Sequence, residues 1–113
     1  MSQDVLVVLN SSRFGQGNPQ LGERLMKNFL NSLVSNSTRP TAILLYNSAV
    51  VLASEESAVL EDLQALEKEG IEVLVNEESL SFYNLDTVLK AGKSCPLSEM
   101  SEKMMNADLI VKP

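Results

Sequence analysis

Residues 73–85, VLVNEESLSFYNL, decide the fold, because an apolar run stops there at a polar patch. The apolar part, residues 73–75, is followed directly by Asn76, two glutamates and Ser79. A short run rich in Val, Ile or Leu is typical of a strand that is covered on both faces of a sheet. The stretch therefore predicts a buried strand whose carboxyl end opens onto a polar surface.

Short apolar runs of the same kind recur through the chain and predict four strands. They are expected at residues 5–9, 42–46, 71–75 and 109–111. The first two runs are apolar throughout, which indicates that helices cover both faces of the sheet.

Helices are predicted between these runs, where apolar residues recur every three or four positions. The first helix is expected to follow Asn18, which can cap it, with Pro19 in its first turn. The second, which contains Leu60, Leu63 and Leu66, is expected to end at Gly70 in a left-handed conformation.

Two shorter helices are expected after the third strand. One runs from Asn84, its cap, to Gly92, and the other has Pro96 at its first position and continues through Met104. The alternation of strands and helices implies an α/β fold with a mainly parallel sheet. We expect one domain over residues 1–113, a three-layer α/β/α sandwich with four to five strands.

Residues 47–54, NSAVVLAS, do not fit this alternation. The run is too short for a helix, so it extends the second strand, forms a hairpin-like return or exposes Val50, Val51 and Leu52. Packing into the local core is the favoured interpretation. An exposed contact with another subunit is the alternative, because exposed apolar patches tend to mark interfaces.

Composition excludes several classes of function. The 113 residues include 9 Lys and Arg against 15 Asp and Glu, a formal net charge of −6, and no basic cluster suits nucleic acid. No apolar run approaches the roughly 18 residues of a membrane span, and the first residues, MSQD, show no secretory signal. We therefore expect a cytoplasmic protein with no nucleic-acid or membrane partner.

The chain has no His and one Cys, Cys95. It thus lacks the commonest general base and the thiolate set of a zinc site, and we expect no metal and no cofactor. With Pro96 opening a helix, Cys95 would occupy the cap position, where the helix dipole and Lys93 favour a thiolate. Cys95 is therefore the one candidate for a catalytic residue. The alternative is a half-buried Cys that serves as a small apolar side chain.

Three strands run directly into asparagine, at Asn10, Asn47 and Asn76. Ligands of open parallel sheets bind at the carboxyl ends of the strands, and each amide offers donors and an acceptor. Asparagine also stops strands and makes turns, so both interpretations stay open. The glycine-bearing loop of residues 11–17 can present N–H groups to an anion, but it matches neither a dinucleotide-binding nor a Walker motif.

Five segments together resemble the DsrE/DsrF-like family: VVLNSSRFGQGNPQLGERLMKNFL, ILLYNSAVVL, SAVLEDLQALEKEGIEVLV, SLSFYNL and NADLIVKP. The resemblance covers nearly the whole chain and is strongest to the C-terminal DsrE-like domain of YedF-type proteins, which are linked to sulfur transfer and selenium metabolism. It implies a parallel α/β fold, a homo-oligomer, and a sulfur-carrier or selenium-metabolism protein as a partner.

The chain departs from this family where YedF-type proteins carry a C-G-T-C motif, directly after the third strand. Asn76, Glu77, Glu78 and Ser79 stand there instead. The resemblance therefore implies a small oligomeric binding or interaction module without thiol chemistry at those positions, and the alternative is a sulfurtransferase or sulfur carrier that uses Cys95. The expected ligand pocket comprises Asn10, Ser11, Ser12, Gly15, Gly17, Asn47, Asn76 and Ser79.

Overall fold

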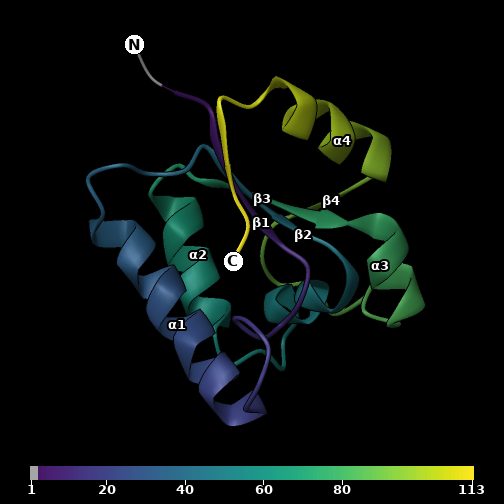
Figure 1. Ribbon diagram of the computed structural model, residues 1–113. Helices are drawn as coiled ribbons and strands as arrows, with labels where there is room; N and C mark the ends of the chain where they lie inside the picture. The colour runs from purple at the N-terminus through teal and green to yellow at the C-terminus, as the bar shows by residue number, and fades with distance from the viewer. Residues whose placement is uncertain (1–2) are drawn as a thin grey trace.

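Five strands, all parallel, form the central sheet of the computed structural model, which describes residues 3–113 (Figure 1). Their order across the sheet is β4-β3-β2-β1-β5. The strands are β1 (Val5–Leu9), β2 (Ala42–Leu45), β3 (Glu72–Asn76), β4 (Lys93–Cys95) and β5 (Leu109–Val111). The predicted α/β fold with a parallel sheet of four to five strands is confirmed.

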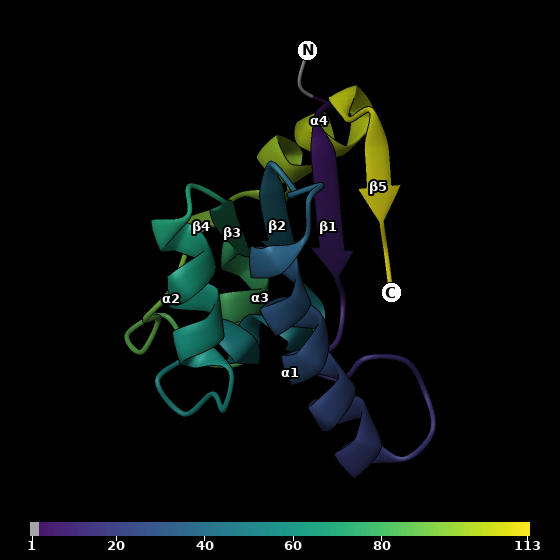
Figure 2. The same cartoon turned by 90° about the vertical axis from the view of Figure 1, so that its left-hand side faces the viewer.

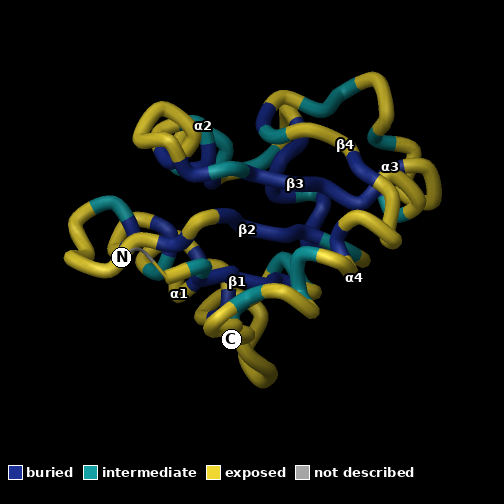
Figure 3. Tube along the Cα trace, turned by 90° about the horizontal axis from the view of Figure 1, so that it is seen from above, coloured by how far each residue is buried: buried dark blue, intermediate teal, exposed yellow. Residues whose placement is uncertain are grey.

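Helices cover the sheet on both faces. Figures 1 and 3 show α1 (Pro19–Ser35) and α2 (Leu60–Lys68) on one face and α4 (Leu97–Asn106) on the other. Two short helices, η1 (Asn47–Ala53, a 3-10 helix) and α3 (Glu77–Phe82), follow β2 and β3 directly. The carboxyl ends of these two neighbouring strands therefore lead straight into the helices that surround the candidate site.

The core has two halves, one on each face of the sheet, because successive side chains of a strand point in opposite directions. In β1, Val7 and Leu9 belong to the larger half, together with α1, α2 and η1. Leu6 and Val8 belong to the smaller half, together with Met100 of α4. All five residues of β1 are buried (Figure 3), as the apolar composition of the strand predicts.

Two predicted helix ends are confirmed. The Asn18 side chain caps α1, because its Oδ1 accepts a hydrogen bond of 2.9 Å from the backbone N–H of Leu21. Gly70 ends α2 at φ +89°, the left-handed conformation that glycine adopts without steric cost. None of the helices in residues 3–113 has the length and apolar character needed to cross a bilayer.

The predicted third helix over residues 84–92 is wrong. The helix instead begins directly after β3, as α3, and Asn76 is its cap. Asn84 has φ +57°, a left-handed conformation that ends the preceding turn, whereas a helix cap needs extended backbone. Residues 84–92 form the connection to β4, a three-residue strand that the sequence analysis missed.

Residues 47–53 form η1, so the expectation that this run is too short for any helix is wrong. A 3-10 helix closes its turns with fewer residues than an α-helix, which lets it form here. Val50 and Leu52 are buried and join the larger half of the core. The favoured interpretation, local core packing, is therefore confirmed for these two side chains.

Candidate functional site

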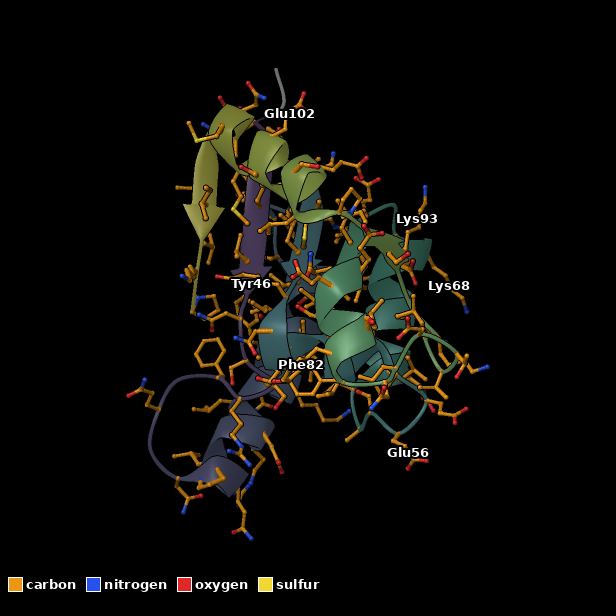
Figure 4. The ribbon with its side chains drawn as sticks, turned by 90° about the vertical axis from the view of Figure 1, so that its right-hand side faces the viewer. Tyr46, Glu56, Lys68, Phe82, Lys93 and Glu102 are labelled. Carbon is orange, nitrogen blue, oxygen red and sulfur yellow. The ribbon has the colours of Figure 1, made fainter. Side chains whose placement is uncertain are left out.

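A cavity of about 390 Å³ lies at the carboxyl ends of β2 and β3. Three of the residues predicted for the ligand pocket line it, namely Asn47, Asn76 and Ser79. Its other lining residues are Tyr46, Glu78, Phe82, Tyr83 and Leu97. Figure 4 labels Tyr46 near the carboxyl ends of the strands and Phe82 at the end of α3.

Hydrogen bonds join the three predicted residues into one network. The backbone N–H of Ser79 donates to Asn76 Oδ1 at 2.9 Å, and the Ser79 hydroxyl donates to the same oxygen at 2.7 Å. Ser79 Oγ in turn accepts from the backbone N–H of Asn47 at 2.8 Å, and the Tyr83 hydroxyl donates to Asn47 Oδ1 at 3.1 Å. Because a backbone N–H can only donate, these bonds fix the orientation of the Asn76 amide.

The other end of that amide lacks a partner. Asn76 is 4% exposed, and within residues 3–113 its Nδ2 has no hydrogen-bond acceptor. A buried donor without a partner costs about 1–3 kcal/mol, and few such groups occur in native proteins. Asn76 therefore caps α3 with its oxygen, and its N–H₂ group stays buried without an acceptor beside the cavity that the residue lines.

The remaining predicted pocket residues lie elsewhere. Asn10, Ser11, Gly15 and Gly17 do not line this cavity, because the chain leaves β1 in a long loop that turns away towards the start of α1 (Figure 2). Ser12 lines a second cavity, of about 310 Å³. Gly15 and Gly17 have φ +81° and +126°, so these glycines serve the turn.

Two aromatic residues that were not predicted for the site form one wall of the cavity. Phe82 and Tyr83 pack edge to face, with ring centroids 5.3 Å apart, at the carboxyl end of α3. Both residues belong to the stretch 73–85, and a capped helix beginning at Glu77 would have placed them opposite Asn47. The available signal was Asn76 followed by two glutamates, a composition that suits the first turn of a helix.

Cys95 lies at the end of β4, beside Asn76 of β3 in the sheet register. The prediction that Cys95 caps α4 is wrong, because Pro96 occupies the cap position. The Cys95 side chain is 3% exposed and packs in the smaller half of the core with Leu74 and Met100. The short strand was missed because Lys93 and Ser94 make it polar.

The environment of Cys95 disfavours a thiolate. Burial, and then the nearby carboxylates of Glu99 and Glu77, raise the pKa of the Cys95 thiol to about 11. The prediction that the helix dipole and Lys93 lower this pKa is wrong, because the thiol is buried and lies near carboxylates. No group of three or more His, Cys, Asp and Glu residues within the described part of the chain could hold a metal ion.

The sheet order and the two helical layers define a three-layer α/β fold. No protein-family model and no curated protein sequence matches the chain significantly. Among solved structures, the ychN protein from E. coli superposes with a TM-score of 0.75 at 14% identity, over 98% of this chain and 99% of that one. A protein of unknown function from Methanobacterium thermoautotrophicum, MTH1491, superposes with a TM-score of 0.72 at 12% identity, over 99% and 100%. These similarities support the DsrE-like fold.

Proposed function

We propose that this chain is a DsrE-like binding or interaction subunit without thiol chemistry at the carboxyl end of β3. The observation that carries the proposal is the hydrogen bond from the Ser79 hydroxyl to Asn76 Oδ1. An amide oxygen is too weak a base to activate a serine, so Ser79 serves the local structure and is not a nucleophile. Binding is the function that the cavity and its amide network support.

The proposal includes a link to sulfur or selenium metabolism, which rests on the resemblance to YedF-type proteins. Such a subunit would recognise a sulfur carrier or a selenium-metabolism protein and would not carry sulfur itself. Recognition without transfer agrees with the substitution of Asn76 and Ser79 at the positions of the family cysteines.

A sulfurtransferase or sulfur carrier that uses Cys95 is the second candidate. One observation favours it, namely that Cys95 is the register partner of Asn76 and so lies one strand from the cavity. The raised pKa opposes it, because the thiolate is the nucleophilic form.

The two candidates differ in the reactivity of Cys95. We expect iodoacetamide at pH 8 to label the folded protein at least 100-fold more slowly than the urea-unfolded chain. A rise in the pKa from 9.0 to about 11 lowers the thiolate fraction roughly 100-fold, and burial slows access further.

The raised pKa of the Cys95 thiol also makes the free energy of unfolding depend on pH. Because the folded pKa is the higher one, the contribution of the neutral thiol is fully present below pH 9 and is lost as pH rises through about 11.

Sulfur transfer is tested on the same preparation. After exposure to inorganic polysulfide, from which a reactive thiolate takes a terminal sulfur atom and releases the shortened polysulfide, the intact mass of the folded protein is expected to show no added sulfur atom. A Cys95→Ser variant serves as the control. An added sulfur that is present in the wild type and absent from the variant would overturn the proposal and establish the second candidate.

Self-association is part of the proposed function, and β5 supports it. This edge strand (Figure 2) carries three exposed apolar residues, Leu109, Ile110 and Val111. An exposed apolar edge is a ready site for pairing with another chain. We propose that a second copy of this chain covers it.

We expect the Leu109→Lys variant to elute as a monomer in size-exclusion chromatography with light scattering, while the wild type elutes as an oligomer. A charge on an edge strand blocks pairing between sheets. Leu97→Lys is the matched control, because Leu97 is as exposed as Leu109 (52% against 50%) but lies beside β4, at the opposite edge of the sheet. A monomeric wild type would remove self-association from the proposal.

A further inference from the structure

We propose that the cavity at the carboxyl ends of β2 and β3 binds a small neutral molecule that has a planar apolar body and a carbonyl oxygen. In this complex the carbonyl oxygen accepts a hydrogen bond from Asn76 Nδ2. The inference rests on the proposed function, because it names the ligand class of the same site.

The unpaired amide of Asn76 is the first observation. Its Oδ1 accepts from both the N–H and the hydroxyl of Ser79, so the amide cannot be flipped without losing these bonds. Its Nδ2 therefore presents two N–H bonds, and the described part of the chain offers them no acceptor. A ligand that places an acceptor oxygen there satisfies a group that the chain leaves unpaired.

The sheet register shows what surrounds this donor. Alternation along β3 places Asn76 on the same face as Leu74, which is the face that α4 covers. On one side lies Cys95, its register partner, and on the other lies Tyr46, which follows the partner of Val75 in β2. Neither neighbour satisfies Nδ2, and both Asn76 and Tyr46 line the cavity.

The walls of the cavity suit a planar apolar body. Phe82 is 81% exposed although it is aromatic, and the one aromatic contact it makes within residues 3–113 is the edge-to-face packing with Tyr83. Leu97, at the start of α4, is the other apolar residue of the wall. An exposed aromatic ring is stabilised when another flat apolar group packs against it and removes it from water. A volume of about 390 Å³ lies within the usual range for small-molecule sites.

The charges around the cavity select against an anion. Glu78 lines it, and no Lys or Arg does. The carboxylates of Glu99 and Glu77 act on Cys95, the neighbour of Asn76, so the field at this end of the sheet is negative. A primary carboxamide suits both Asn76 and Glu78. Its oxygen can accept a hydrogen bond from Asn76 Nδ2, and its N–H bonds can donate to the Glu78 carboxylate.

The test uses the full chain, labelled with ¹⁵N, and two probes of nearly the same shape, benzamide and benzoate. Benzamide is expected to shift the side-chain amide signals of Asn76 saturably in ¹H–¹⁵N spectra, with a dissociation constant at least tenfold lower than that of benzoate. The Asn76→Asp variant keeps an acceptor for Ser79 but replaces the N–H₂ group by oxygen, and we expect it to bind benzamide at least tenfold more weakly.

Phe82→Ala is the second variant, chosen because an exposed side chain can be removed without unfolding the chain. We expect it to weaken benzamide binding about fivefold, while Met105→Ala, which removes an equally exposed side chain from α4 (83%), leaves binding unchanged. Three results would each overturn the inference. They are Asn76 signals that do not respond to benzamide, benzoate binding that is equal or tighter, and benzamide binding that is unchanged in both Asn76→Asp and Phe82→Ala. These outcomes leave the proposed function intact, because that proposal is decided by the sulfur adduct.

Discussion

Replacing Gly92 by alanine is expected to lower the free energy of unfolding by about 2–5 kcal/mol. Gly92 lies in the connection just before β4, where the chain passes close against β3. A Cβ atom at this position would come within 2.8 Å of Val73 O and within 2.9 Å of a methyl carbon of Val73 and of Val75. Distances this short require the backbone to move.

The backbone around Gly92 has little freedom to do so. Val73 and Val75 are buried residues of β3, which is paired with β2 on one side and β4 on the other. Gly92 also has φ +77°, a conformation that alanine adopts only at a cost. Steric overlap and backbone strain therefore both contribute to the loss of stability expected for Gly92→Ala.

Gly70→Ala is the matched control for this prediction. Gly70 has a similar φ of +89°, but a Cβ atom there would meet nothing within 4 Å. We expect it to lose only about 1 kcal/mol, the cost of the left-handed conformation alone. Urea unfolding followed by circular dichroism measures both variants. Equal losses for the two would contradict the close approach of Gly92 to β3.

Met100→Ala is expected to lower the free energy of unfolding by about 2–5 kcal/mol. Met100 is fully buried and is the residue of α4 that fills the smaller half of the core. It packs in one cluster with Leu6, Val8 and Leu44 of the two central strands. Because α4 is the helix that covers this face (Figure 1), alanine at this position leaves a cavity between α4 and the sheet.

Met105→Ala tests the same substitution five positions further along the same helix. Met105 is exposed to solvent, so its replacement is expected to change the stability by no more than about 0.5 kcal/mol. Thermal or urea unfolding of the two variants separates burial from helix propensity, since both remove the same side chain from α4. Similar losses would show that α4 does not hold the smaller half of the core.

The strands that local composition specifies were predictable from the sequence. β1 and β2 are apolar throughout, β3 has an apolar centre at residues 73–75, and the caps at Asn18 and Gly70 have their usual residue types. The strand β4 was not predictable in this way, because Lys93 and Ser94 are polar and exposed. β4 forms through its tertiary pairing with β3, which the local composition of residues 93–95 does not reveal.

The misplacement of α3 has a similar cause. Asn76 ends β3 and caps α3 at once, so no connecting residues separate the two elements. A loop expected after β3 places the predicted helix after Asn84, but Asn84 ends the turn that follows α3.

The candidate site was predictable in part for a geometric reason. Asn47 and Asn76 follow neighbouring strands and meet in one network, as the rule for parallel sheets predicts. Asn10 also follows a neighbouring strand, but no short helix returns after it, and the loop carries the following residues away from the sheet end. The direction in which each connection leaves its strand therefore decides which asparagines meet.

The position of β1 bears on the order of assembly during folding. It pairs with β2 through Leu6 and Ala42 on one side, and with β5 through Val5 and Leu109 on the other. The second pairing joins residues about one hundred positions apart, so its loop closure is among the slowest and most entropically costly steps. The strands β1 to β4 can thus assemble before β5 is in place, which leaves one edge of β1 unpaired. An unpaired apolar strand edge is prone to aggregation, so this is the stage at which chaperones would protect the chain.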